Sequence, residues 1–227
     1  MLSYDSAVPN GQDSPSSGPL PVPSAKPMST SAAGTIATSG HGQVQRQHQH
    51  HLWLVTGPAG CGKTTVAEHL ANALSIPYIE GDLYHPQANI DKMSGGIPLT
   101  DSDRWDWLTE LRKQSNSRIN SGADGVVVAC SALKLKYRDV IRVAAYYDRT
   151  LLVHFIFLHA PQELLLKRVA ERKGHYMGAN MVKSQFDILE RPREDEVDVI
   201  TIDASQDSDE VKQDALEKVQ AALAANM

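Results

Sequence analysis

The chain has 227 residues, a formal net charge of −5 at pH 7 and two cysteines, Cys61 and Cys130. An acidic balance without a basic stripe argues against nucleic-acid binding, and no apolar run approaches the roughly 20 residues that a membrane-spanning helix needs. Two cysteines are too few for a disulfide scaffold and fit a reducing compartment. We therefore expect a cytoplasmic protein that binds neither nucleic acid nor membrane.

The first fifty residues differ in composition from the rest of the chain. Residues 1–50 are rich in Ser, Pro, Gln and His, with almost no aromatic residues and no apolar periodicity. Such a segment cannot bury enough surface to offset its chain entropy, so we predict a disordered tail. Its histidines at 48, 50 and 51 could bind a transition metal weakly, although a solvated polar segment explains them more simply. Residues 51–227 remain for one domain with one hydrophobic core.

A short apolar strand, Leu52–Thr56, leads into a glycine-rich loop and then into a helix that we expect from Thr64 to Leu74. The loop fits G-x-x-x-x-G-K-[ST] at every fixed position. Its glycines let backbone N–H groups point at a phosphate, and the helix N-terminus adds partial positive charge. Lys63 would reach the β- and γ-phosphates, and the Thr64 hydroxyl would coordinate Mg²⁺. The predicted ATP-binding residues here are Gly57, Pro58, Ala59, Gly60, Cys61, Gly62, Lys63, Thr64 and Thr65.

Strands and helices alternate through the rest of the chain. The predicted strands are Tyr78–Glu80, Gly125–Cys130, Leu151–Leu158 and Val197–Ile202. The predicted helices are Asp103–Ile119, Ala132–Ala145, one from Pro161 through Val169, Met181–Leu189 and Val211–Leu223. The segment between Glu80 and Thr100 is polar. This order indicates an α/β fold in which helices flank a five-stranded parallel sheet, with the ligand at the carboxyl ends of the strands.

Two carboxylates, Glu80 and Asp82, directly follow the second predicted strand. One of them, Glu80, could hold Mg²⁺ through water. The other, Asp82, could accept a hydrogen bond from an attacking hydroxyl and orient it toward the γ-phosphorus. An acidic helix cap or turn would explain one of these residues more easily than both. We therefore predict Lys63 and Asp82 as catalytic residues, and Thr64 and Glu80 as the metal site.

Three further segments narrow the function. They are G-D-x-x-H-P from Gly81, K-M-x-x-G-x-P-L-x-D-x-D-R from Lys92 and C-S-A-L-K-x-x-Y-R-D from Cys130. Together they resemble the gluconokinase family closely, over about residues 52–203. The resemblance implies a P-loop kinase fold similar to shikimate and nucleoside-monophosphate kinases, and a homodimer. It also implies phosphorylation of D-gluconate by ATP and Mg²⁺ at the 6-hydroxyl, which yields 6-phospho-D-gluconate for the pentose phosphate pathway. Glu80 departs from the pattern, since bacterial relatives often carry Asp there.

Gluconate is a linear polyol with one carboxylate, so its site requires a cation and several polar groups. The predicted substrate-binding residues are Asp82, His85, Arg104, Ser131, Lys134 and Arg138. Arg104 is the first choice for the carboxylate because a planar guanidinium forms a bidentate pair. Lys134 and Arg138 could equally be ion-pair partners elsewhere. His85, which precedes Pro86, could simply begin a rigid turn.

A basic segment after the helix that begins at Pro161 would form a mobile lid in kinases of this type. Closing would bring Arg172 against ATP and exclude water. Two alternatives stay open from the sequence: a shikimate or monophosphate kinase, and a nucleotide-binding regulator without turnover. The intact Lys63, Thr64 and Asp82 disfavour the regulator.

Overall fold

The computed structural model of the protein describes residues 48–146, 148–171 and 179–226. Most of the predicted tail (residues 1–47) and the predicted lid residue Arg172 lie outside these described residues. The strands are β1 (His50–Thr56), β2 (Tyr78–Glu80), β3 (Gly125–Ala129), β4 (Leu151–His159) and β5 (Val199–Asp203). The helices are α1 (Lys63–Leu74), α2 (Gln87–Ser94), α3 (Asp101–Asn120), α4 (Leu135–Arg142), α5 (Gln162–Glu171), α6 (Ala179–Asp187) and α7 (Ser208–Asn226), with short 3₁₀ helices η1 (Gly81–Tyr84) and η2 (Val143–Ala145).

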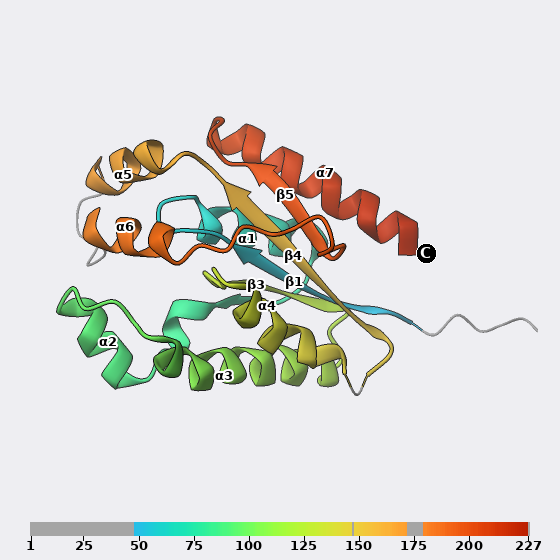
Figure 1. Cartoon of the computed structure of the whole chain (residues 1–227). Helices are drawn as coiled ribbons and strands as arrows, with labels where there is room; N and C mark the ends of the chain where they lie inside the picture. Colours follow the sequence, from blue (N-terminus) through green and yellow to red (C-terminus); the bar gives the residue numbers. More distant parts are fainter. Residues whose placement is uncertain (1–47, 147, 172–178, 227) are drawn as a thin grey trace, which may run out of the picture. The chain divides into compact units, whose positions relative to one another are not determined.

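The five strands form one parallel sheet in the order β2-β3-β1-β4-β5, which confirms the predicted architecture (Figure 1). The central strand β1 pairs on one side with β3 and on the other with β4, so Trp53 lies between Val127 and His154. The chain passes from β1 toward β2 and β3 on one side, and later to β4 and β5 on the other. The order therefore switches direction at β1, and a ligand crevice is expected beyond its carboxyl end.

Alternate residues of β1 face the two layers of helices, as the period of two in a strand requires. Leu52 and Leu54 are fully buried in a core with residues of α3 and α4. Trp53 and Val55 lie in a second core with residues of α1, α5, α6 and α7. Figure 1 shows α3 and α4 side by side on one side of the sheet. Both faces of β1 are covered over Leu52–Val55, which explains why this part of the strand is a continuous apolar run.

The structure adds two elements and corrects one boundary. The polar segment after Glu80, in which the sequence delimits no element, contains η1 and α2. Of the eight residues of α2 only Asn89 and Met93 are buried, so its sequence carries little apolar periodicity. The predicted helix from Ala132 begins only at Leu135. Ala132 has a φ of 34°, in the left-handed region, which no helix can include.

The strand β1 also begins earlier than predicted, at His50, whose Nδ1 lies 3.1 Å from the carbonyl oxygen of Ala123. Among the described residues, no group of three or more His, Cys, Asp or Glu side chains could hold a metal ion. Within the same part of the chain, no helix is both long and apolar enough to cross a bilayer.

His154 is a half-buried histidine far along the sequence from the phosphate loop. Its ring stacks on Trp53 with centroids 4.1 Å apart, and its Nε2 lies 3.1 Å from Nδ1 of His51. Partial burial and, to a smaller extent, the neighbouring His51 lower the pKa of His154 to about 4, although Asp198 opposes the shift. In the unfolded chain the pKa of a histidine is about 6.5.

The free energy of unfolding is therefore expected to fall as the pH decreases from about 6.5 to 4, because the unfolded chain then binds the proton that folded His154 excludes. His154→Phe should keep the stacking on Trp53 and remove this contribution. Urea unfolding at pH 7 and pH 5, followed by tryptophan fluorescence, should show a smaller loss of stability for the variant. An equal loss in both proteins would assign the pH dependence to other groups.

Candidate active site

A cavity of about 140 Å³ lies at the carboxyl edge of the sheet, where the phosphate loop (Gly57–Thr64) follows β1. Most of its lining comes from the segments that the sequence singles out. The lining residues are Ala59, Gly60, Gly62, Lys63, Thr64, Thr65, Glu80, Asp82, His85, Met93, Leu99, Arg104, Trp107, Ser131, Val169, Met181 and Gln185. The structure thus brings residues from six helices, the phosphate loop and two strand ends to one place.

The phosphate loop has the backbone that an anion site needs. Gly60 has a φ of 85°, and a Cβ there would lie 2.9 Å from a methyl group of Val169, so only glycine fits. The helix α1 begins directly after Gly62, with no side chain capping its first turn. The N–H groups of that turn therefore have no partner within the helix and remain available to a phosphate. The Lys63 ammonium donates to the carbonyl oxygen of Pro58 at 3.1 Å, at the rim of the same loop.

Three predicted loop residues, Gly57, Pro58 and Cys61, do not line the cavity. Cys61 is buried in the core, and burial raises the pKa of its thiol. It therefore stays protonated, and its role in the loop is that of a small apolar residue.

The predicted metal residues meet at the end of β2. The Thr64 hydroxyl donates to Oε2 of Glu80 at 2.8 Å, and the Tyr78 hydroxyl donates to the same oxygen at 2.6 Å. Burial and the hydrogen bond to Glu80 both raise the pKa of Tyr78, so this hydroxyl remains a donor. Hydroxyl and carboxylate oxygens are the ligands that Mg²⁺ prefers. The donor set therefore fits a magnesium ion, and Tyr78, which the sequence did not indicate, orients its carboxylate.

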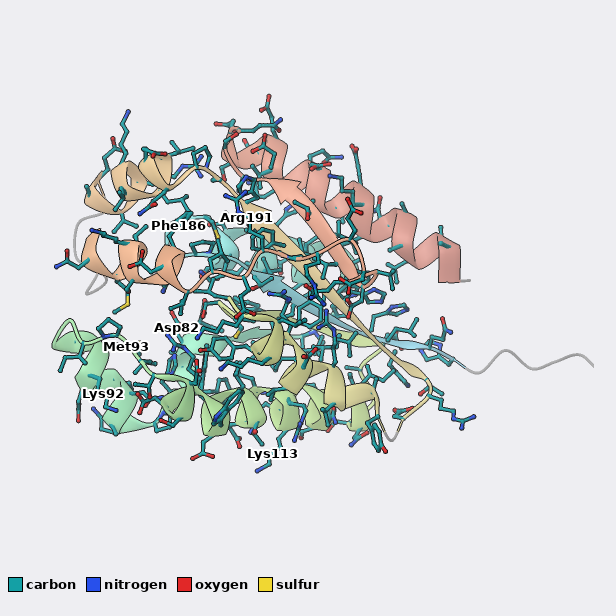
Figure 2. All side chains as sticks on the ribbon, viewed as in Figure 1. Asp82, Lys92, Met93, Lys113, Phe186 and Arg191 are labelled. Carbon is teal, nitrogen blue, oxygen red and sulfur yellow. The ribbon has the colours of Figure 1, made fainter. Side chains whose placement is uncertain are left out.

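Asp82 enters the cavity because Gly81 lets two strand ends approach closely. A Cβ at Gly81 would lie 2.3 Å from the carbonyl oxygen of Ala129, at the end of β3. The Asp82 side chain is 44% exposed, and its Oδ1 lies 4.0 Å from Nε2 of His85. In Figure 2 Asp82 lies at the same end of the sheet as Met93. A half-exposed carboxylate at this place can meet a substrate hydroxyl.

His85 is held on the floor of the cavity. Its ring stacks on Trp107 with centroids 4.0 Å apart, and the Trp107 indole donates to the carbonyl oxygen of Gly81 at 2.8 Å. Burial, assisted by the charge of Arg104, lowers the pKa of His85 to about 4. His85 is therefore neutral near pH 7. Its Nδ1 lies 3.4 Å from the amide nitrogen of Asn89, which leaves the N–H at Nε2 as the donor that it can offer a substrate hydroxyl. Trp107 is a buried core residue.

Arg104 is 9% exposed and lies on the first turn of α3. All three of its hydrogen bonds use one nitrogen, NH1, which donates to the carbonyl oxygens of Leu99 and Thr100 and, at 3.4 Å, to the Tyr137 hydroxyl. The Tyr137 hydroxyl itself donates to Asp101. Within the described residues, Nε and NH2 of Arg104 have no hydrogen-bond partner. These two nitrogens form one edge of a guanidinium, which is the edge that a carboxylate binds with two hydrogen bonds.

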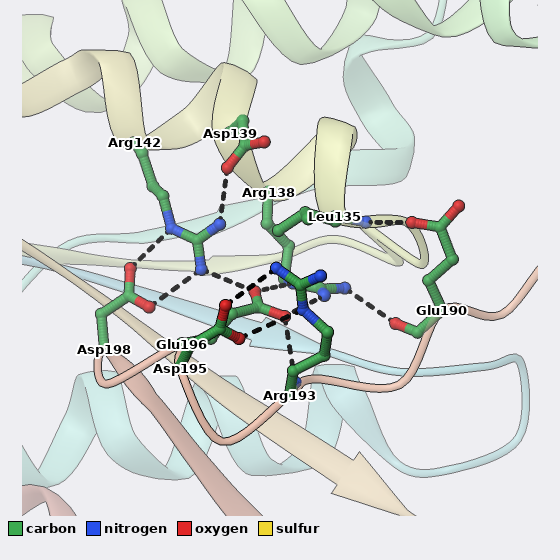
Figure 3. Close-up of polar contacts among 9 residues, drawn as sticks. All are labelled: Leu135, Arg138, Asp139, Arg142, Glu190, Arg193, Asp195, Glu196 and Asp198. Carbon is green, nitrogen blue, oxygen red and sulfur yellow. Dashed lines mark hydrogen bonds and ion pairs between the residues drawn. The ribbon is translucent and has the colours of Figure 1, made fainter.

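The other two predicted cations, Lys134 and Arg138, are not among the residues that line the cavity. The Lys134 ammonium lies 2.9 Å from Asp101. Arg138 is fully buried, and its Nε and NH2 donate to the two oxygens of Glu196 at 2.7 and 2.6 Å (Figure 3). Burial opposes ionisation of Glu196, but the hydrogen bonds from Arg138 and Arg142 outweigh it and lower the pKa of Glu196 to about 2. Both charges of this buried pair are therefore satisfied without a ligand.

The same network fixes the loop that carries Ser131. Arg138 also donates to the carbonyl oxygen of Glu190 at 3.1 Å, and the Glu190 carboxylate accepts from the N–H of Leu135 at 2.8 Å. At its other end the loop is tied to β1, because the Ser131 carbonyl oxygen accepts from Thr56 and from Gly57. Arg138 therefore acts on the site through the position of this loop.

Sequence reasoning missed part of the lining. Met93, Leu99 and Met181 form a small apolar cluster that joins α2 and the loop after it to α6. Met93 and Leu99 lie in a segment that was singled out for its motif, but nothing in the sequence placed Met181 or Gln185 beside them. The predicted ATP contact Arg172 falls outside the described residues.

A glycine-rich loop between a strand and a helix, beside a magnesium-type carboxylate, defines a P-loop nucleotide-binding protein with a kinase fold. Residues 52–194 match the family described as "AAA domain". The structure is similar to that of a gluconokinase from Sinorhizobium meliloti 1021, with 41% identity and a TM-score of 0.67 over 80% of this chain and 97% of that one. An APS kinase from Mycobacterium tuberculosis, 19% identical with a TM-score of 0.55, shares the fold.

Curated relatives show which family of kinases the chain resembles. A probable gluconokinase of Schizosaccharomyces pombe is 45% identical over 181 residues, which cover 76% of this chain and 90% of the relative. The thermosensitive gluconokinase of Escherichia coli K12 is 43% identical over 68% of this chain and 80% of its own length. The chain belongs to the gluconokinase family.

Proposed function

We propose that the protein transfers the γ-phosphoryl group of ATP to the 6-hydroxyl of D-gluconate, which gives ADP and 6-phospho-D-gluconate. One observation carries the proposal. The cavity beside the phosphate loop contains both a carboxylate that can orient a hydroxyl, Asp82, and a cation, Arg104, whose Nε and NH2 have no hydrogen-bond partner among the described residues. Membership of the gluconokinase family supports the same substrate.

In this mechanism Lys63 and the first turn of α1 hold the phosphates of ATP, and Arg104 holds the gluconate carboxylate. Asp82 accepts the hydrogen bond of the 6-hydroxyl and takes its proton as the bond from that oxygen to the γ-phosphorus forms. The bond from the γ-phosphorus to the bridging oxygen breaks, and ADP leaves with the electron pair. Neutral His85 and the Ser131 hydroxyl bind other hydroxyls of the polyol. Catalysis consists mainly of positioning and charge stabilisation.

Magnesium would be held by Thr64 directly and by Glu80 through water. Bound there, it would neutralise part of the negative charge of the phosphates. Tyr78 donates to one Glu80 oxygen and so orients this carboxylate toward the site. The longer side chain of Glu80, compared with the Asp of bacterial relatives, is compatible with this indirect contact.

The test is a coupled ADP-release assay with D-gluconate, its stereoisomers, shikimate and nucleoside monophosphates. We expect turnover with gluconate that requires a divalent cation, and identification of 6-phosphogluconate by mass spectrometry. Robust turnover on shikimate or a nucleotide, without gluconate-dependent ADP release, would reject the proposal. We also infer a cytoplasmic homodimer from the family resemblance, which sedimentation and cell fractionation would test.

Removal of residues 1–47 is expected to leave kcat/KM within about two-fold of the full chain. The described residues that line the cavity all lie at or after Ala59, and β1 begins at His50. The comparison is of steady-state kinetics for the full and shortened chains. A shortened chain that folds, judged by circular dichroism, but loses most of its kcat/KM would show that the tail contributes to the site.

A further inference from the structure

Gln185, on α6, is a cavity residue for which the proposed mechanism has no role. Its Oε1 accepts a hydrogen bond from the backbone N–H of Ala59 at 2.7 Å. Ala59 is the third residue of the phosphate loop, so this contact joins α6 to the loop across 126 residues of sequence. An N–H group can bond only to the oxygen of a carboxamide, and this contact therefore fixes which way the amide points.

Because the oxygen is engaged, the free end of the side chain is its NH₂ group. Within the described residues, Nε2 of Gln185 has no hydrogen-bond partner, although the residue lines the cavity. Two N–H donors without a partner, beside the loop that binds phosphate, require an acceptor when a ligand excludes water. The oxygens of a phosphoryl group are such acceptors.

The helix that carries Gln185 is held by packing on both sides of it. Val182, one turn before Gln185, is fully buried in the core that includes α5, and Met181 contacts the cluster with Met93 and Leu99. Gln185 therefore projects from a packed element. Preorganised donors of this kind are effective where charge develops during a reaction.

We propose that Gln185 is a further catalytic residue, whose Nε2 donates a hydrogen bond to the phosphoryl group during its transfer. The proposal rests on the proposed kinase function. As the bond from the gluconate oxygen to the γ-phosphorus forms and the bond to ADP breaks, negative charge is spread over the three equatorial oxygens. A neutral donor held at the loop by Ala59 stabilises that charge. It contributes little to the binding of ADP, because ADP has no γ-phosphoryl group.

The decisive variant is Gln185→Glu, because glutamate keeps an oxygen for the Ala59 N–H but loses both donors and brings a negative charge toward the phosphoryl group. Gln185→Met removes the donors and the acceptor without adding charge. Lys183→Gln is the matched control: it is exposed on the same helix and changes the net charge by the same one unit. Thermal unfolding checks that all three variants fold.

Two readouts follow each protein: kcat for ATP and gluconate, and calorimetric affinities for ADP and for a non-hydrolysable ATP analogue. For Gln185→Glu we expect kcat to fall about 10²-fold and the affinity for the analogue to fall at least 10-fold more than that for ADP. For Gln185→Met we expect kcat to fall about 10-fold, and the affinity for the analogue should again fall more than the affinity for ADP. Lys183→Gln should match the wild type in both readouts.

Two results would overturn the proposal. In the first, Gln185→Glu keeps kcat within about two-fold of the wild type. In the second, its affinities for ADP and for the analogue fall by equal factors. Either result would mean that Gln185 serves only to hold the phosphate loop. The binding readout also separates this proposal from the function on which it rests. A wild-type protein that binds the analogue but does not phosphorylate gluconate would reject the substrate, while the ratio of the two affinities would still test Gln185.

Discussion

Asp82→Asn is expected to lower kcat by roughly 10²-fold or more, with little change in the affinity for ATP. Asparagine has the same size and keeps an oxygen acceptor, so it can still receive the hydrogen bond of the 6-hydroxyl. It cannot take the proton as the new bond to phosphorus forms. The loss should therefore appear in the chemical step, measured by initial rates at saturating ATP and gluconate, and not in calorimetric binding of ADP.

Asp106→Asn is a suitable control, because it removes one exposed carboxylate from α3 outside the cavity. It should leave kcat unchanged. If Asp82→Asn keeps a near-normal kcat, Asp82 is not the partner of the nucleophile, and Glu80 becomes the remaining carboxylate of the described cavity lining. Lys63→Ala, by contrast, should weaken ATP binding and turnover together. In the proposed mechanism the Lys63 ammonium holds the phosphates both in the bound substrate and in the transition state.

Arg104→Ala should raise the KM for gluconate by roughly 30- to 150-fold, the equivalent of about 2–3 kcal/mol for a charge-assisted bidentate contact. The KM for ATP should change far less. Because NH1 of Arg104 is engaged with Leu99, Thr100 and Tyr137, the guanidinium is already oriented before substrate arrives. The affinity lost on truncation is therefore mainly the contact with the carboxylate.

A neutral analogue, in which the gluconate carboxylate is reduced to an alcohol, gives the sharper measurement. The wild type should discriminate strongly against the analogue, and Arg104→Ala should lose much of that discrimination. Tyr137→Phe keeps the ring under Arg104 but removes one hydrogen bond to it, so its discrimination should be intermediate. Lys113→Ala, an exposed cation on the same helix, should behave as wild type. Undiminished discrimination in Arg104→Ala would assign the carboxylate to another group.

Lys134 and Arg138 do not line the cavity, and replacing them should have different effects on the protein. Lys134 is partly exposed and shares Asp101 with Lys136, so the site can lose it at small cost. Arg138 is buried against Glu196, and its removal would take away the two hydrogen bonds that pair this buried carboxylate with Arg138, leaving Arg142 as its ion-pair partner among the described residues. Loss of activity in an Arg138 variant would therefore reflect folding, and it would not identify a substrate contact.

The sequence by itself determined the features whose parts are close together along the chain. The phosphate loop could be recognised because one continuous segment supplies the backbone turn, Lys63 and Thr64, with the strand and helix on either side. The strands β1 and β3 could be recognised because strands covered on both faces carry continuous apolar runs, here Leu52–Val55 and residues 125–129. The helix α2 was missed because its two buried residues leave no clear period, although Pro86 before it and Gly95 after it are the usual marks of helix ends.

Only the tertiary structure decided which polar side chains reach the cavity. The sequence could not decide among Arg104, Lys134 and Arg138. All three are cations within the motifs quoted above, and no neighbouring residue in the sequence indicates which of them faces the cavity. Arg138 is committed to Glu196, 58 residues away, and Gln185 meets Ala59 across 126 residues. Such pairings depend on which elements the sheet order brings together. Whether a charged side chain forms an ion pair or faces the cavity depends on its burial and on its distance from other charges. Neither quantity is defined until the chain has folded.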